Sequence, residues 1–212
     1  MIVPAYNEEA LLAETLKSVS EALRCSEMAE RSEVIVVDNN STDRTAEIAK
    51  SMGAQVVFEA KNQISRARNA GGNAARGKFL LFLDADTALS GELLGRALAN
   101  LRSGDCCGGG VVLQMDRDVS VGMSRVIAFW NGIAVKLGLA AGCFIYCLRE
   151  GFLAVGGFSH AVYAGEEIWY SRALQKWGRR RGLKFVVITD VTISTSSRKL
   201  EWFSSGQLLL QT

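Results

Sequence analysis

Carboxylates stand at a few positions of this sequence where loops are expected, and they are its most chemically suggestive feature. Asp84 and Asp86 directly follow the apolar run 79–83. Their i, i+2 spacing points both side chains to the same side of an extended chain. Two adjacent carboxylates repel each other, so a divalent cation or sugar hydroxyls would compensate them. The alternative is that both acids only form a turn and cap the next helix.

Other acids occupy comparable positions. Asp38 follows the apolar run 34–37, and Glu166 and Glu167 stand where a helix is expected to begin. A carboxylate held near a hydroxyl group can take its proton as the oxygen attacks. Each acid also has an ordinary alternative, since Asp favours turns and acids in a first helical turn favour the positive end of the helix dipole.

The elements that must position these acids alternate between strand and helix in the first part of the chain. Residues 79–83 are all large and apolar, which is typical of a strand buried on both faces of a parallel sheet. Apolar residues at helical spacing predict a first helix over 11–23, which Asn7 can cap. The other expected elements are strands at 1–3, 34–37 and 55–58, a helix that ends at Gly53 and a helix over 65–75.

Strand and helix thus alternate four times, which predicts an α/β fold with a right-handed, mostly parallel sheet and helices on both faces. Ligands of such sheets bind beyond the carboxyl ends of the strands. The acids that follow strands are therefore expected to meet at one edge.

Beyond Asp86 the pattern changes, and no linker interrupts it, so we expect one compact domain over 1–212. The segment 126–148 is long and apolar enough to raise the question of a membrane span. Because it contains Asn131 and Lys136, we expect a soluble helix followed by a buried strand, with a helix lying on a membrane surface as the alternative. The remaining expected elements are helices at 91–101, 166–178 and 200–210, strands at 108–113 and 184–189 and a turn at 156–158.

Composition narrows the classes of function. The net charge of +2 gives no large field that would attract nucleic acid, and the basic residues 179–181 with Lys184 are expected to be a solvated helix end. The five cysteines include no Cys-x-x-Cys pair, which favours reduced thiols over a disulfide framework or a zinc site. No cleavable signal is visible at the start, so we expect a cytoplasmic protein, with the inner face of the membrane as an alternative location.

Six short segments in a fixed order resemble the signatures of family 2 glycosyltransferases, enzymes of the GT-A fold. The segments are Pro4-Ala5-Tyr6-Asn7-Glu8-Glu9, Val36-Val37-Asp38-Asn39-Asn40-Ser41-Thr42-Asp43, Ala67-Arg68-Asn69-Ala70-Gly71, Phe82-Leu83-Asp84-Ala85-Asp86, Gly156-Gly157-Phe158 and Gly165-Glu166-Glu167. The resemblance implies a nucleotide-sugar-binding half, 1–87, and a half for acceptor binding and catalysis, 88–212.

The resemblance also implies roles for single residues. Asp84 would contact the ribose and sugar, and Asp86, the second acid of the Asp-x-Asp motif, would hold Mg²⁺ or Mn²⁺ on the diphosphate. Glu167 would be the catalytic base at a position where Asp is usual, with Glu166 as the alternative base. The other residues implied to bind the nucleotide sugar are Pro4, Ala5, Tyr6, Glu8, Asp38, Gln63, Arg66, Arg68, Ala85 and, against the diphosphate, Arg198.

The expected function is inverting transfer of one sugar from a uridine or guanosine diphosphate sugar to an acceptor hydroxyl, with a divalent metal. The apolar segment 126–148 suggests a lipid-linked acceptor and peripheral contact with a membrane, and no partner nucleic acid is expected. Two alternatives stay open at this point: a nucleotidyltransferase, which can use a related sheet and paired acids, and a module that binds sugar nucleotides without turnover.

Overall fold

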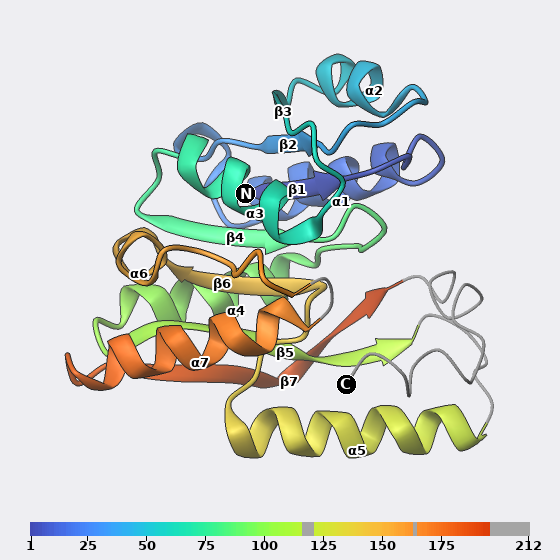
Figure 1. The fold of residues 1–212 in the computed structure, drawn as a ribbon. Helices are drawn as coiled ribbons and strands as arrows, with labels where there is room; N and C mark the ends of the chain where they lie inside the picture. Colours follow the sequence, from blue (N-terminus) through green and yellow to red (C-terminus); the bar gives the residue numbers. More distant parts are fainter. Residues whose placement is uncertain (116–120, 163–164, 196–212) are drawn as a thin grey trace.

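One mixed sheet organises the residues that the structure describes, which are 1–115, 121–162 and 165–195 of this computed structural model (Figure 1). Its strands lie in the order β3-β2-β1-β4-β6-β5-β7. The strands are β1 (Ile2–Ala5), β2 (Ile35–Asp38), β3 (Gln55–Phe58), β4 (Phe79–Leu83), β5 (Cys106–Met115), β6 (Phe144–Leu148) and β7 (Lys184–Thr195).

Parallel pairs predominate, as the sequence predicts. β1 pairs in parallel with β2 and β4, β2 with β3, and β5 with β7, whereas β6 runs antiparallel between β4 and β5. Ala5 lies opposite Asp38 across the β1–β2 pair, and Ile2 lies opposite Phe82 across the β1–β4 pair. The carboxyl ends of β1, β2 and β4 therefore share one edge of the sheet.

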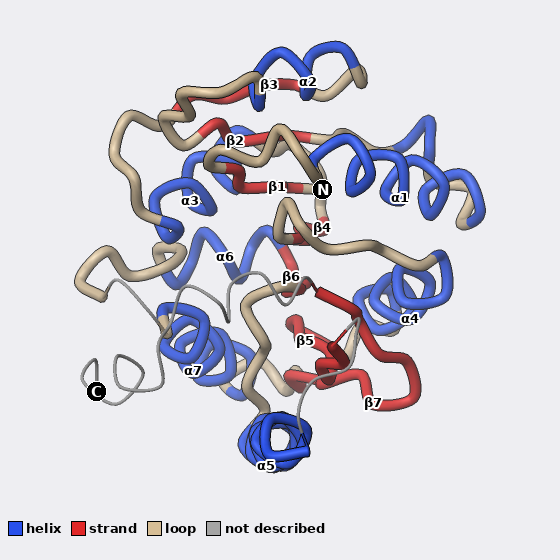
Figure 2. The backbone as a smooth tube through the Cα atoms, turned by 90° about the vertical axis from the view of Figure 1, so that its right-hand side faces the viewer, coloured by secondary structure: helices blue, strands red, loops and turns tan. Residues whose placement is uncertain are grey.

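Helices cover both faces of the sheet, because successive strand residues point to opposite sides. Val3 packs with α1, α2 and α4 on one face, while its neighbour Ile2 packs with α3, α6 and α7 on the other. Both faces of the sheet are thus covered, and the prediction of helices on both faces is confirmed (Figures 1 and 2). The helices are α1 (Leu12–Cys25), α2 (Thr45–Ser51), α3 (Ile64–Ala74), α4 (Gly91–Arg102), α5 (Val121–Leu137), α6 (Arg149–Val155) and α7 (Glu166–Arg179), with a 3₁₀ turn at Ala29–Arg31.

The apolar segment 126–148 folds as expected, since α5 is followed by the buried strand β6. Asn131 fastens α5 to β5, because its side chain accepts a hydrogen bond from Leu113 N at 3.0 Å and donates one to Leu113 O at 2.9 Å. Within the described part of the chain, every helix is too short or too polar to traverse a bilayer.

Three details differ from expectation or lie beyond the structure. Asn7 does not cap the first helix: α1 begins only at Leu12, and Asn7 has a positive φ of 51° and accepts a hydrogen bond from Thr42 N. The short helix α6 was not expected. The helix expected over 200–210 lies outside the described residues.

Candidate functional site

The loop that follows β4 is held firmly at the carboxyl edge of the sheet. Thr15 of α1 donates a 2.7 Å hydrogen bond to the carbonyl oxygen of Ala85, and the backbone nitrogen of Asp84 donates to Cys143 O at 3.1 Å. Both Ala85 and Asp86 are buried. The two acids are therefore fixed by neighbouring elements rather than displayed on a free turn.

Arg68 of α3 joins three separate parts of the chain in this region. Its Nη2 donates to Asp84 Oδ1 at 3.1 Å and to the carbonyl oxygen of Gly142 at 2.7 Å, and its Nη1 donates to Glu166 Oε1 at 2.5 Å. The guanidinium also lies 5.4 Å from the ring centre of Phe158. Arg68 is only 2% exposed, so this is a buried ion-pair network and not a surface salt bridge.

The charged groups in this network shift one another's pKa values. Burial alone would lower the pKa of Arg68, but Asp84, Glu166 and Glu167 outweigh it and raise that pKa, so the guanidinium stays charged. The pKa of Glu167 is raised, first by burial and then by the negative charge of Glu166, with Arg68 acting in the opposite direction. A carboxyl whose pKa is raised in this way is better suited to accept a proton near neutral pH than an ordinary glutamate.

The loop after α6 is tied to α3 by two amide side chains. Asn69 accepts from Phe158 N at 2.8 Å and donates to Phe158 O at 2.8 Å, and its Nδ2 lies 2.8 Å from His160 Nε2. Gln63 donates to the carbonyl oxygens of His160 and Val162 at 2.9 and 3.2 Å. One side of α3 therefore holds the loop, while Arg68 holds the acids.

The residues expected to bind the nucleotide lie along the same edge but differ in accessibility. Pro4 and Ala5 are buried in β1, whereas Tyr6 is 49% exposed just beyond it. Asp38 is buried and accepts a 2.9 Å hydrogen bond from Ser41 N, so it forms the turn that the alternative interpretation allowed. That bond uses one carboxylate oxygen, and the nucleotide role of Asp38 stays a prediction.

Three more of the expected residues complete the picture. Glu8 follows Tyr6 in a loop, where its backbone nitrogen donates to Thr45 Oγ1 at 2.8 Å. The side chain of Arg66 donates to Gln63 Oε1 at 3.2 Å. Arg198 lies outside the described residues.

Asp86 offers a carboxylate, which is a type of ligand that Mg²⁺ accepts, but alone it would supply few of the ligands that the ion needs. In residues 1–115, 121–162 and 165–195, no three His, Cys, Asp or Glu side chains are placed to hold a metal by themselves. Magnesium in proteins commonly uses one or two carboxylates together with substrate phosphates and water. A cation here would thus depend on a bound diphosphate.

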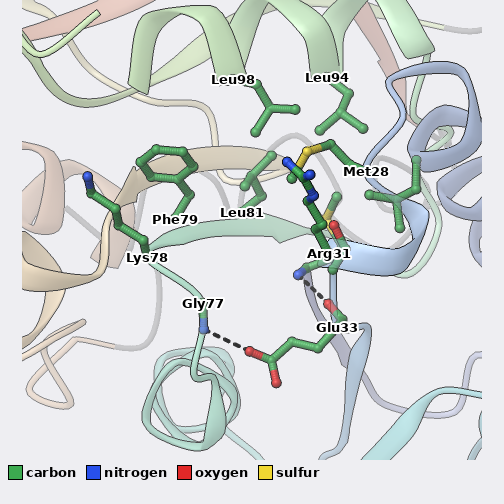
Figure 3. Close-up of a pocket in the computed structure, with 12 residues that line it drawn as sticks. Met28, Arg31, Glu33, Gly77, Lys78, Phe79, Leu81, Leu94 and Leu98 are labelled. Carbon is green, nitrogen blue, oxygen red and sulfur yellow. Dashed lines mark hydrogen bonds between the residues drawn. The ribbon is translucent and has the colours of Figure 1, made fainter. Parts of the chain in front are cut away.

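A cavity of about 240 Å³ lies elsewhere and does not belong to this site (Figure 3). It opens near Gly77 at the amino end of β4, opposite to the end that carries Asp84. Leu81, Leu94 and Leu98 point into it, so its lining is largely apolar (Figure 3). The candidate site and the cavity therefore lie at opposite ends of β4.

Two residues of the site were given no role in the sequence analysis. The carbonyl oxygen of Gly142 accepts a hydrogen bond from Arg68, and no sequence pattern predicts which backbone carbonyl will do so. Asn69 has a signal, because an asparagine inside a helix is a poor helix former and is usually retained for a polar contact.

Solved structures with the same architecture are GT-A glycosyltransferases. The mannosyltransferase PcManGT from Pyrobaculum calidifontis, in complex with GDP-Man and Mn²⁺, matches with a TM-score of 0.73 and 23% identity over 91% of this chain and 55% of its own. Glucosyl-3-phosphoglycerate synthase from Mycobacterium tuberculosis, in complex with Mn²⁺, uridine diphosphate and phosphoglyceric acid, matches with a TM-score of 0.68 and 21% identity over 95% and 71%. This likeness establishes the fold.

The family model described as Glycosyl transferase family 2 matches residues 1–152. The chain therefore belongs to glycosyltransferase family 2, as the ordered motifs implied. A 4,4'-diaponeurosporenoate glycosyltransferase of Staphylococcus haemolyticus is 38% identical over 43% of this chain and 25% of its own length. An undecaprenyl-phosphate 4-deoxy-4-formamido-L-arabinose transferase of Edwardsiella ictaluri is 32% identical over 63% and 42%. The match thus spans less than half of the length of either relative.

Proposed function

We propose that this chain transfers one sugar, with inversion, from a uridine or guanosine diphosphate sugar to an acceptor hydroxyl, and that Mg²⁺ or Mn²⁺ assists the reaction. The observation that carries the proposal is the Arg68 network, which joins Asp84 on the donor side to Glu166 at the start of α7. The division into a donor half, 1–87, and an acceptor half, 88–212, is part of the same proposal.

In the proposed reaction Glu167 is the base. Its carboxylate takes the proton of the acceptor hydroxyl while that oxygen forms a bond to the anomeric carbon, and the bond from this carbon to the diphosphate breaks on the opposite side. Attack opposite to the leaving group inverts the anomeric centre. The raised pKa of Glu167 supports this role, whereas Glu166 already accepts the shortest hydrogen bond of Arg68 and positions it.

On the donor side, Asp84 would face the ribose and sugar, and Asp86 would hold the cation. A cation bound there would neutralise the negative charge that develops on the departing diphosphate. Arg68 Nε is buried and has no hydrogen-bond partner among the described residues. The complexes of related folds with GDP-Man or UDP and Mn²⁺ support this class of donor.

We further propose that the acceptor is lipid-linked and that the chain works at the cytoplasmic face of a membrane. An undecaprenyl-phosphate transferase among the relatives supports a polyprenyl-type acceptor. The apolar composition of α5 supports contact with a membrane surface.

The test has a binding step and a catalytic step. A thermal-shift series with uridine and guanosine diphosphate sugars, with and without Mn²⁺, should show stabilisation that grows with ligand concentration. Glu167→Gln should keep this shift and lose about 10²- to 10⁴-fold in transfer, the usual contribution of a general base. The matched control is Glu150→Gln, since the Glu150 side chain is 74% exposed on α6.

Different outcomes separate the alternatives. Absence of binding to any sugar nucleotide would refute the proposal, and release of pyrophosphate from a nucleoside triphosphate would indicate a nucleotidyltransferase. Binding without transfer or hydrolysis would indicate a module that only binds. If Glu166→Gln alone abolished transfer, the base would be Glu166.

A further inference from the structure

One face of α5 is turned to solvent and carries small and apolar side chains between two cations. Its members recur every three or four residues, which places them on one side of a helix. They are Arg125, Ala128, Phe129, Gly132, Val135 and Lys136, all exposed. Phe129 is 72% exposed and Val135 44%, and the sequence of α5 contains no acid. Apolar side chains of α5 are therefore exposed as well as buried, since Ala134 on the same helix is 3% exposed.

The exposed face of α7 is cationic and begins with an aromatic residue. Trp169 is 64% exposed, and Arg172, Lys176 and Arg179 follow on the same side at intervals of three or four residues. In the described part of the chain none of these three cations forms a salt bridge. The acids of α7, residues 166 and 167, lie in its first turn and face the Arg68 network. The basic helix end expected from the sequence is thus one end of a longer stripe.

These two faces are neighbours. α5 and α7 run side by side in both views of the fold, toward the β7 end of the sheet, whereas α2 lies at the β3 end (Figures 1 and 2). Gln175 of α7 joins them, since its side chain donates hydrogen bonds to Leu137 O at 3.1 Å and to Gly138 O. The exposed apolar side chains of α5 and the cations of α7 therefore belong to neighbouring helices.

We propose that the exposed faces of α5 and α7 form a docking surface for a bilayer that contains anionic lipids. Apolar and aromatic side chains can enter the boundary between headgroups and acyl chains, while unpaired Arg and Lys side chains attract anionic headgroups. The charge of this surface is complementary to anionic lipids, because five cations and no exposed acid lie on the exposed faces of α5 and α7. This inference rests on the proposed function in one respect: Glu167 lies in the first turn of α7, so docking would present a lipid-linked acceptor to the base.

The experiment is sedimentation of the full chain with vesicles of phosphatidylcholine alone or with phosphatidylglycerol added. The chain should bind the anionic vesicles and dissociate as salt is raised. Arg172→Glu with Lys176→Glu should weaken binding by about tenfold or more, and Phe129→Ser with Val135→Ser by several-fold.

Matched controls come from the opposite end of the sheet. Lys50→Glu tests charge, and Met52→Ser tests apolar exposure, since Met52 is 45% exposed next to α2. Both should leave vesicle binding unchanged. Equal losses in the controls, or no binding to anionic vesicles, would overturn the proposal. A dimer that the α7 charge reversals dissociate, without vesicle binding, would instead assign the surface to a second copy of the chain.

Vesicle binding and donor binding fail independently. Binding to anionic vesicles without a thermal shift by any sugar nucleotide would keep the docking surface and reject the proposed transfer. A thermal shift and transfer to a soluble acceptor without vesicle binding would keep the transfer and reject the surface.

Discussion

Replacement of Arg68 by methionine should destabilise the fold strongly. Arg68 is 2% exposed, and the side chains of its partners Asp84 and Glu166 are 14% and 5% exposed. Removing one member of a buried ion pair leaves an uncompensated charge and costs about 3–5 kcal/mol. Since a domain is stable by about 5–15 kcal/mol, this loss would take a large fraction of the total. In a chain of this size it would lower Tm by on the order of 10 °C.

The assay is urea unfolding of the variant beside two others. Arg96→Met removes an ion pair with Asp190 whose N–O distance is 2.6 Å but whose side chains are 55% and 54% exposed. That change should cost less than about 1 kcal/mol, because exposed pairs contribute little. Arg68→Lys keeps the charge but cannot reproduce the planar fork that reaches Asp84, Glu166 and Gly142 O, so it should fall between the two.

The comparison of the variants identifies the cause, because methionine keeps much of the apolar length of arginine but removes its charge. A loss no larger than that of Arg96→Met would refute the conclusion that Arg68 is needed to compensate buried acids.

Three further predictions concern single sites. The pKa of Glu167 is raised in the folded state, so ionisation of its carboxyl group destabilises the fold. This destabilisation is absent below the ordinary pKa of 4.5 and is complete once pH exceeds the raised pKa. Glu167→Gln should therefore raise the free energy of unfolding in urea at neutral pH but not in acid. Gly157 has a φ of +73° and a Cβ there would strike Asn69 Oδ1, so Gly157→Ala should lower Tm more than Gly53→Ala, where φ is +79° but the space is open; equal losses would contradict this. Gly95→Ala, inside α4 with open space around it, should stabilise by about 0.5–1 kcal/mol in the same assay, and a loss would be contrary to the reasoning.

The sheet was predictable because local patterns determine it. Uninterrupted apolar runs such as 79–83 are long enough to identify buried strands, and helical spacing identifies α1 and α3. The short helix α6 was missed because its seven residues directly follow a strand and offer fewer than two full turns of periodicity. Asn7 was assigned as a cap on spacing alone, but its contact with Thr42, 35 residues later, is tertiary.

The same limit applies to the candidate site. The ordered motifs identified which residues gather there, and the parallel strands explained why Ala5 and Asp38 are adjacent. The target of Arg68 was not predictable, because Glu166 lies 98 residues further along the chain and α3 and α7 meet only in the folded state. The resemblance implied that Arg68 binds the nucleotide sugar, and the structure adds that two carboxylates and a carbonyl oxygen accept hydrogen bonds from its guanidinium group.

The Arg68 network also gives a physical reason why two consecutive glutamates can have different roles. Neighbouring residues on a helix point about 100° apart, so Glu166 and Glu167 cannot both bind the same guanidinium well. Glu166 is 4% exposed and accepts the 2.5 Å hydrogen bond from Arg68, which fixes its position. Glu167 is less buried than Glu166, and Arg68 acts on it only through the electrostatic attraction of its charge. Burial and the charge of Glu166 therefore leave the pKa of Glu167 raised. A general base needs that combination of accessibility and proton affinity. The positive charge of Arg68 stabilises Glu167 and Glu166 beside each other.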